Sequence, residues 1–209
     1  MKQLSTFNSM MICLETLCIK SGEISNVAYH DARFNATRKK LFGLNTTQSL
    51  KDLISVPLDL DLDKIYRCRV LYEKNIEQVE FIPYIEKKIR HLKLVEISGD
   101  YNYTFKWADR SCFTQLLKDN ADVDELIMVK NGCVTDCTIA NLVFFDGKDW
   151  FTSSTPLLYG TRRVKLLDEK KIIEAEIKVK DLSKYEKIVL INAFRDLDES
   201  KAIPIAQII

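Results

Sequence analysis

The stretch Asp124 to Arg163 reads DELIMVKNGCVTDCTIANLVFFDGKDWFTSSTPLLYGTRR. An apolar run, 125–129, ends at a turn signal, and two further β-rich runs cover 133–138 and 141–145. After Gly160-Thr161 the apolar residues recur at helical spacing. A polar turn that leads into a helix can bind a phosphate, because unpaired backbone N–H groups and the helix dipole both point at it. The stretch therefore predicts three strands followed by a helix whose start is a candidate anion site.

Length and composition narrow the classes of protein. The chain has 209 residues, enough for one large domain or two small ones. Lys and Arg total 31 and Asp and Glu total 30, so the net charge favours neither a nucleic-acid nor a membrane partner. No apolar run approaches the roughly 20 residues that span a bilayer, and residues 1–4 are not followed by the apolar core of a signal peptide. We expect a cytoplasmic protein.

The cysteines and histidines argue against a disulfide framework or a metal site. Six cysteines are scattered through the chain, which is typical of reduced thiols. Cys133 and Cys137 lie four residues apart, but the chain has only two histidines and neither forms a pair with ligand spacing. We expect no metal.

The first half of the chain predicts a small α+β lobe. Residues 10–19 have the pattern of a buried strand interrupted by Glu15-Thr16, and a helical stretch follows that ends near Gly43. A capped segment from Thr47 to Val56 predicts a second helix, and residues 65–83 predict a β-hairpin. We place the boundary between two lobes near Gly99, which gives an N-terminal domain of 1–98 and a C-terminal domain of 99–209.

Lys106 lies in the aromatic-rich segment YNYTFKW, residues 101–107. Read as an extended strand, this segment points Lys106 to the face opposite Tyr103 and Phe105. Asp109 can cap a following helix with an apolar side. A lysine among aromatics with a cation nearby, here Arg110, has a lowered pKa and can act as a nucleophile. The alternative is an ordinary surface lysine.

The order of these parts resembles the aminotransferase class IV family, the pyridoxal-phosphate enzymes of fold type IV. The run Val134 to Val143 is similar to the family's Val-Thr-Glu-x-x-x-x-Asn-Leu-Phe, with Asp136 in place of the glutamate. Residues 106–110, KWADR, resemble its Lys-x-x-Asn-Arg, and residues 160–163, GTRR, resemble its Gly-Ile-Thr-Arg. Residues 30–33 match His-x-x-Arg. The match is specific over 104–205 and looser over 15–42.

This resemblance implies a two-lobed α+β fold like that of the D-amino acid and branched-chain aminotransferases, with pyridoxal 5′-phosphate as the cofactor. It implies that Lys106 holds the cofactor as a Schiff base and that Asp136 pairs with the ring nitrogen. The remaining residues that it assigns to the cofactor are Arg33, Leu158, Thr161, Arg162 and Asn192. Without the family, Arg33 reads as a solvated helix residue, Asp136 as a solvated aspartate near a turn, and Leu158 as core.

Within the family, residues 190–193, LINA, are similar to the Ile-Cys-Asn-Ala of 4-amino-4-deoxychorismate lyase, which forms 4-aminobenzoate and pyruvate for folate synthesis. The resemblance therefore implies a lyase acting on a small amino substrate, in a homodimer. Branched-chain or D-amino acid transamination stays open, because it uses the same residues. A non-catalytic relative also stays open, because the N-terminus is short and Asp109, Asp136 and Arg162 depart from the family pattern.

Overall fold

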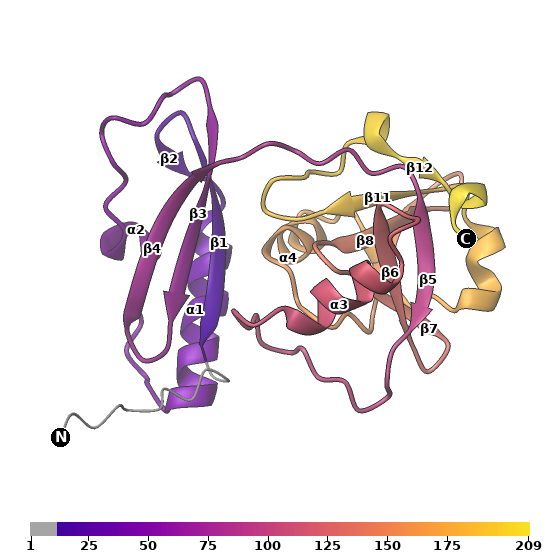
Figure 1. Ribbon diagram of the computed structural model, residues 1–209, viewed down its shortest axis with the longest axis horizontal. Coiled ribbons are helices and arrows are strands. Elements are labelled where there is room, and N and C mark those ends of the chain that lie inside the picture. Colours follow the sequence, from indigo (N-terminus) through magenta and orange to yellow (C-terminus); the bar gives the residue numbers. More distant parts are fainter. Residues whose placement is uncertain (1–11) are drawn as a thin grey trace.

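The computed structural model describes residues 12–209, which form two lobes (Figure 1). The N-terminal lobe has a four-stranded sheet and the C-terminal lobe an eight-stranded one, so the predicted α+β class is confirmed. The strands are β1 Cys13–Lys20, β2 Glu23–Ile24, β3 Ile65–Tyr72, β4 Ile76–Pro83, β5 Leu92–Glu96, β6 Glu125–Lys130, β7 Cys133–Cys137, β8 Asn141–Phe145, β9 Trp150–Ser153, β10 Ile173–Ala175, β11 Lys187–Ile191 and β12 Ile203–Pro204. The helices are α1 Val27–Phe42, α2 Leu50–Leu53, α3 Ser111–Asp119 and α4 Thr161–Asp168, with short 3-10 helices at Val179–Lys184, Glu199–Lys201 and Ile205–Gln207.

The small lobe is an antiparallel sheet in the order β2-β1-β3-β4, and the predicted hairpin is its β3 and β4. Every second residue of β3 is buried, because successive side chains of a strand point to opposite faces. Helix α1 packs on the buried face, where the rings of Phe34 and Tyr72 meet edge to face at 4.7 Å. Gly43 ends α1 as predicted, with the left-handed φ of 70° that glycine adopts without strain.

The second helix is much shorter than predicted. The sequence predicts a helix from Thr47 to Val56, whereas α2 is a single turn. Side chains of α1 bind the backbone before it: Asn35 donates to the carbonyl of Gln48 and accepts from its N–H, and Asp31 accepts from the N–H of Leu50. These hydrogen bonds hold the segment before Leu50 extended, because side chains that bind the backbone compete with helix formation.

The larger sheet contains the strands that the opening stretch of sequence predicts. Its order is β10-β9-β8-β7-β6-β5, with β11 on β8 and β12 on β11. The pairs β5–β6 and β9–β10 are parallel and the others antiparallel. Helix α4 begins at Thr161 as predicted, and its Leu166 packs with apolar residues of β8 and β11. The LINA motif begins in β11, at Leu190 and Ile191.

The two sheets divide earlier in the chain than the predicted boundary near Gly99. The segment after β4 crosses between the lobes (Figure 1), and β5 then pairs in parallel with β6 over 92–96. Hydrogen bonding therefore assigns these residues to the larger sheet, and the crossover lies between Pro83 and Leu92. The predicted strand over 10–19 is β1, of which residues 10 and 11 lie outside the described part of the chain.

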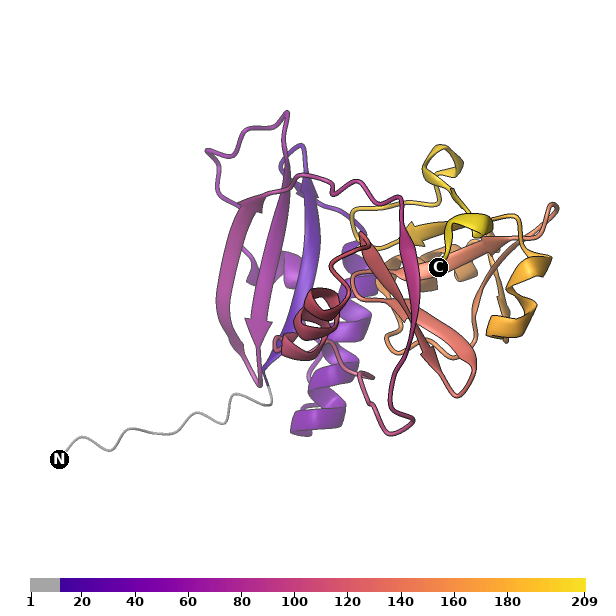
Figure 2. The same ribbon diagram turned by 45° about the vertical axis from the view of Figure 1, so that its right-hand side comes forward.

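The segment 101–107 is not the strand that its alternating aromatics predict. It is a bent loop in which the Asn102 side chain accepts from the N–H and hydroxyl of Thr104. Its end attaches to the small lobe, where Leu14 N–H donates to the Lys106 carbonyl and Ala108 N–H donates to the Ile12 carbonyl, each at 2.8 Å. Figure 2 shows this segment reaching the small sheet beside α3. Across residues 12–209, none of the helices combines the length and apolarity of a membrane crossing.

Candidate active site

A cavity of about 390 Å³ lies where the lobes meet, within the roughly 300–1,000 Å³ typical of small-molecule sites. The small lobe lines it with residues of β1, α1 and β3. The larger lobe adds the 101–110 loop, the end of β7, the start of α4 and the loop after β11. Six of the seven cofactor residues expected from the sequence line it: Arg33, Lys106, Asp136, Leu158, Thr161 and Asn192. The seventh, Arg162, is not among the lining residues.

Lys106 reaches the cavity from the loop that attaches to β1. Loss of hydration, followed by the positive charges of Arg33 and Arg110, lowers the pKa of its amine to about 7. Near neutral pH a large fraction of the amine is thus unprotonated. An unprotonated amine is the form that condenses with an aldehyde or accepts a proton from carbon.

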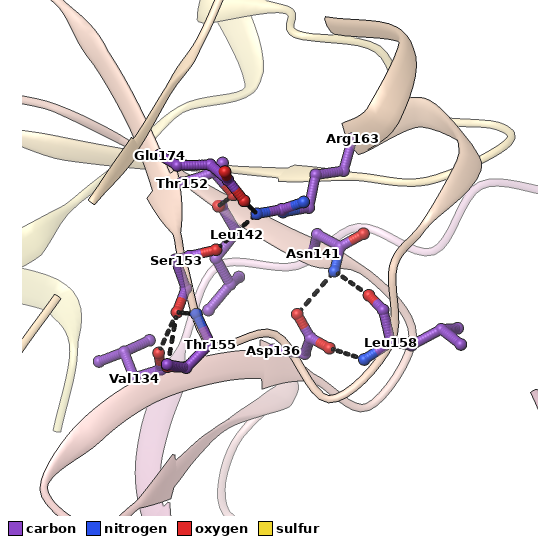
Figure 3. Close-up of polar contacts among 10 residues, drawn as sticks. All are labelled: Val134, Asp136, Asn141, Leu142, Thr152, Ser153, Thr155, Leu158, Arg163 and Glu174. Atoms are coloured by element: carbon purple, nitrogen blue, oxygen red, sulfur yellow. Dashed lines mark hydrogen bonds and ion pairs between the residues drawn. The ribbon is translucent and has the colours of Figure 1, made fainter. Parts of the chain in front are cut away.

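Asp136 is buried near the end of β7, and two N–H donors hold its carboxylate (Figure 3). The Asn141 amide donates to one oxygen at 2.6 Å, and Leu158 N–H donates to the other at 2.9 Å. Burial raises the pKa of this carboxyl to about 6, against the opposing effect of these donors. At pH 7 it is largely ionised, and a carboxylate has further lone pairs that can accept from a protonated ring nitrogen.

Asn141 and Gly160 fix the chain around Asp136. The Asn141 amide also donates to the Leu158 carbonyl at 2.9 Å, so it joins β8 to the loop before α4 (Figure 3). A Cβ at position 160 would lie 2.0 Å from Oδ1 of Asn141. Real Cβ atoms essentially never approach that closely, so any side chain at position 160 would displace Asn141 from these contacts.

Glu15 lies in the middle of β1 with an exposed fraction of 0%. Arg33 donates to both of its oxygens, from Nε at 2.7 Å and from Nη2 at 2.6 Å, and His30 Nδ1 lies 2.7 Å from Oε2. Burial opposes ionisation of Glu15, but the charge and hydrogen bonds of Arg33 and His30 prevail and hold its pKa at about 2. Glu15 therefore neutralises the charge of Arg33.

The start of α4 faces the cavity through Gly160 and Thr161, and no side chain caps it. Its first backbone N–H groups, including that of Arg162, have no partner within the helix. The Thr161 hydroxyl lies 3.2 Å from His30 Nε2. The Arg162 side chain instead pairs with Asp196 at 3.0 Å. Arg162 can therefore offer a phosphate its backbone N–H from the helix start.

Asn192 organises the loop after β11. Its Oδ1 accepts from the N–H groups of Phe194 and Arg195, at 2.8 and 3.1 Å, and its Nδ2 donates to the Ile139 carbonyl at 3.1 Å. Both polar atoms of the side chain thus already have protein partners. Asn192 shapes the cavity wall near Ala193 through these contacts.

Two guanidinium groups in the cavity have no acidic partner among residues 12–209. Arg67, from β3, lies 5.3 Å from the Tyr84 ring and 5.8 Å from the Phe194 ring, and those rings stack at 4.1 Å. Arg110 donates to the Thr138 carbonyl at 2.6 Å and lies over Phe113. Each can therefore neutralise a bound anion, and guanidinium groups are suited to carboxylates.

The sequence alone does not identify Glu15, His30 and Arg67 as residues of the site. A charged residue inside the apolar run of β1 is the signal for Glu15, because buried carboxylates are rare unless they are paired. His30 stands in the His-x-x-Arg match, but it contacts Thr161, a residue 131 positions later in the sequence. Arg67 is one of two arginines in an alternating strand, and only its neighbours in space distinguish it.

The residues present fit pyridoxal phosphate. The start of α4 supplies backbone donors for a phosphate, Asp136 supplies an acceptor for a protonated ring nitrogen, and Lys106 supplies an amine for the aldehyde. The close approach of Asn141 to Gly160 keeps the ring acceptor and the helix start adjacent. All of these groups open onto the same cavity.

Comparison with known proteins agrees with this geometry. The sequence model of the family described as Amino-transferase class IV matches residues 106–203. An uncharacterised protein of Haemophilus influenzae is 38% identical over 185 residues, which cover 88% of this chain and 97% of that protein. A crystal structure of a candidate 4-amino-4-deoxychorismate lyase from Haemophilus somnus 129PT has a TM-score of 0.82 and 35% identity, and the match covers 90% of this chain and 98% of that one.

The fold extends to more distant proteins. A hypothetical aminotransferase of Mycobacterium tuberculosis, solved in a form with bound pyridoxal phosphate, has a TM-score of 0.74 at 16% identity, over 96% of this chain and 85% of its own. At that identity the likeness concerns the fold alone. The family match, with the residues that line the cavity, is what supports pyridoxal phosphate as the cofactor. By its sequence, its fold and its closely similar relatives, this chain belongs to the aminotransferase class IV family of fold type IV enzymes.

Proposed function

We propose that this protein is a pyridoxal-phosphate-dependent lyase that converts 4-amino-4-deoxychorismate to 4-aminobenzoate and pyruvate. The observation that carries the proposal is a pair of cations in the cavity, Arg67 and Arg110, that have no acidic partner within the described part of the chain, 12–209. Each product keeps one carboxylate, so the substrate has two in addition to its amine. Two guanidinium groups match that charge pattern, whereas an amino acid with an apolar side chain has a single carboxylate.

When bound, the cofactor supplies an aldehyde that condenses with the substrate amine and a ring that accepts electrons from the neighbouring carbon. Asp136 keeps the ring nitrogen protonated by accepting its hydrogen bond. Lys106, released by the substrate amine, removes the proton from the amine-bearing carbon, for which its low pKa suits it. The ether bond from the ring to the enolpyruvyl oxygen breaks, the departing enolpyruvate takes up a proton to become pyruvate, and the remaining ring becomes aromatic.

The roles of Arg67 and Arg110 in this reaction are positional. Arg67 lies between the lobes beside the Tyr84 and Phe194 rings, which also give a flat substrate an apolar surface. Arg110 lies in the loop that carries Lys106. Carboxylates held at these two points fix the substrate ring so that its amine-bearing carbon faces the lysine.

We propose a homodimer as well. Ile85 lines the cavity with an exposed fraction of 89%, and Ile139 lines it with 38%. Exposed apolar side chains at the rim of a site support a second copy of the chain as the cover that excludes water. Sedimentation equilibrium tests this: a dimer supports the proposal, and a monomer at micromolar concentration with bound cofactor contradicts it.

The deciding experiment is a paired activity assay of the protein loaded with pyridoxal phosphate. Absorbance at about 410–430 nm first shows that the cofactor is bound as an imine of a lysine, and its loss in Lys106→Ala assigns that lysine. The protein is then given 4-amino-4-deoxychorismate, with 4-aminobenzoate as the readout, and separately amino acids with 2-oxoglutarate, with glutamate as the readout. Release of 4-aminobenzoate supports the lyase. Glutamate formation alone shows a transaminase, and silence in both assays from a coloured protein shows a non-catalytic relative.

A further inference from the structure

A chain of hydrogen bonds joins the start of α4 to the small lobe. Thr161 Oγ1 lies 3.2 Å from His30 Nε2, and His30 Nδ1 lies 2.7 Å from Glu15 Oε2. The exposed fractions of these three residues are 5%, 1% and 0%. Water therefore does not compete for these contacts, and the position of each proton follows from the partners.

The proton positions are determined from the Glu15 end. Glu15 is ionised because Arg33 donates to both of its oxygens, and an ionised carboxylate only accepts hydrogen bonds. His30 must therefore carry a proton on Nδ1. A neutral imidazole has one N–H, so Nε2 is then an acceptor and the Thr161 hydroxyl donates its only proton to it. In that state Thr161 presents only oxygen lone pairs to the cavity.

A bound phosphate dianion conflicts with that arrangement. Its oxygens only accept hydrogen bonds, so they face a lone pair of Thr161 instead of a proton. The charges are also unfavourable, because Glu15 cancels Arg33 and a neutral His30 adds nothing. A second proton on His30 changes both: Nε2–H donates to Thr161, the hydroxyl proton turns to the phosphate, and the three side chains of Glu15, Arg33 and His30 together carry one positive charge.

We propose that binding of the cofactor phosphate at the start of α4 draws one proton from solvent onto Nε2 of His30 and reverses the His30–Thr161 hydrogen bond. The charged groups that face His30 are Glu15 from β1, Arg33 from α1 and Lys106 from the 101–110 loop. Burial, Arg33 and Lys106 oppose the charge and Glu15 favours it, with the result that the pKa of His30 lies below its usual value. The phosphate adds two negative charges on the Thr161 side, which raises the pKa of His30.

The consequence is a pH-dependent affinity. Between the pKa of His30 in the free protein and its pKa in the complex, binding takes up a proton, so affinity weakens about tenfold for each pH unit as the pH rises. At pH 7.5 a phosphate monoester is already almost fully a dianion, since its second pKa is about 6. Proton uptake measured at that pH therefore does not come from the phosphate itself, and the difference between the wild type and a Thr161 variant separates the share of His30 from that of Lys106.

Nitrogen NMR of the imidazoles in the full-length protein tests the proposal directly. The chain has two histidines, and the His91→Gln variant, changed at a largely exposed side chain, assigns both signals. The probes at pH 7.5 are pyridoxamine 5′-phosphate and pyridoxamine, which have no aldehyde and leave Lys106 free. We expect His30 to change from neutral to imidazolium with the phosphate form only. A His30 that stays neutral in the pyridoxamine phosphate complex, or that charges equally with pyridoxamine, overturns the proposal.

Calorimetry in buffers of different ionisation enthalpy gives the second readout, the number of protons taken up with pyridoxamine 5′-phosphate. We expect the same uptake for the wild type and for Thr161→Ser, which keeps the hydroxyl. Thr161→Val keeps the shape without the hydroxyl and should take up about one proton fewer, at an affinity reduced about tenfold. Equal uptake by Thr161→Val and the wild type contradicts the path through Thr161. The readouts are binding and protonation, so they stand whether the enzyme proves to be a lyase or a transaminase.

Discussion

The backbone N–H of Leu14 donates a hydrogen bond of 2.8 Å to the carbonyl oxygen of Lys106. A strand of the small lobe thus fixes the backbone of the lysine that lies in the loop before α3. Trp107 continues this contact as an isolated bridge to Cys13. The position of the Lys106 amine therefore depends on how the lobes meet. The same junction brings Arg33 near enough to lower the pKa of that amine.

The first prediction concerns the Lys106 amine. With a pKa of about 7 it is mostly unprotonated at pH 8, whereas a lysine of ordinary pKa, 10.5, is almost fully charged there. The rate at which pyridoxal phosphate condenses with the cofactor-free protein should therefore rise with pH, reach half its plateau near pH 7 and level off above pH 8. Stopped-flow absorbance at about 410–430 nm measures it. A rate that keeps rising toward pH 10 contradicts the prediction.

Matched arginine variants identify the cause of that low pKa. Arg110→Leu removes a positive charge that opposes protonation of Lys106, so the midpoint should move upward in pH. Arg90→Leu removes the same charge from an exposed position outside the cavity and should leave the midpoint unchanged. Equal shifts in both variants would assign the effect to net charge instead of to the site.

The second prediction concerns Gly160→Ala. The added Cβ meets Oδ1 of Asn141 at 2.0 Å, so Asn141 must leave Asp136 and the Leu158 carbonyl. We expect a loss of about 1–3 kcal/mol in unfolding free energy and weaker cofactor binding, measured by urea denaturation and titration. Gly99→Ala is the control, since its Cβ meets only the end of the Asn131 side chain, at 3.1 Å.

A double-mutant cycle isolates that clash. Asn141→Ala removes the atom that the new Cβ strikes, so adding Gly160→Ala to it should cost little more than Asn141→Ala alone. If the two losses simply add, the backbone at position 160 is the cause and the contact with Asn141 is irrelevant.

Local sequence patterns predict the elements whose determinants are local. Apolar runs bounded by turn residues predict strands β6 to β8, and Gly43 predicts the end of α1. The structure confirms both predictions. The segment 101–107 alternates like a strand, yet its end bonds to β1, some ninety residues earlier in sequence. The predicted second helix fails for the same reason, because α1 side chains bind its backbone. Periodicity does not encode such long-range partners.

The candidate site shows the same division. The positions of Lys106, Asp136 and Thr161 follow from motifs, and the structure brings them to one cavity. What each residue can do there depends on contacts across the lobes. Thr161 meets His30, and the Arg162 side chain turns to Asp196, which no spacing in the sequence predicts.

The third prediction concerns Asp136→Glu, which restores the residue that the family motif carries. Both oxygens of Asp136 already have donors at 2.6 and 2.9 Å, and its exposed fraction is 4%. An extra methylene must therefore displace Asn141 or the Leu158 backbone, at a cost of about 1–3 kcal/mol in stability. Thermal denaturation of the cofactor-free protein measures this. A variant as stable as the wild type would show that the pocket already has room for glutamate.

The last prediction separates two arginines that the family resemblance assigns to the cofactor, Arg33 and Arg162. Arg33→Leu leaves Glu15 charged and buried without its main partner, which typically costs about 3–5 kcal/mol. Arg162→Leu breaks only a pair with the exposed Asp196, so less than about 1 kcal/mol is expected. The pH dependence of stability tests the same assignment. The pKa of Glu15 is about 2 in the folded protein and 4.5 ordinarily. The ionised Glu15 therefore stabilises the fold above pH 4.5, and this stabilisation is lost as the pH falls toward 2.

Urea denaturation between pH 3 and 7 measures both effects. Wild type and Arg162→Leu should lose stability together across the acid range, and Arg33→Leu should start lower at pH 7 and lose less between pH 4.5 and 3. Adding Glu15→Gln to Arg33→Leu should recover part of the loss, since it removes the unpaired charge. If Arg162→Leu proves as destabilising as Arg33→Leu, the buried Arg33–Glu15 pair does not stabilise the packing of β1 on α1 more than the surface pair of Arg162 does.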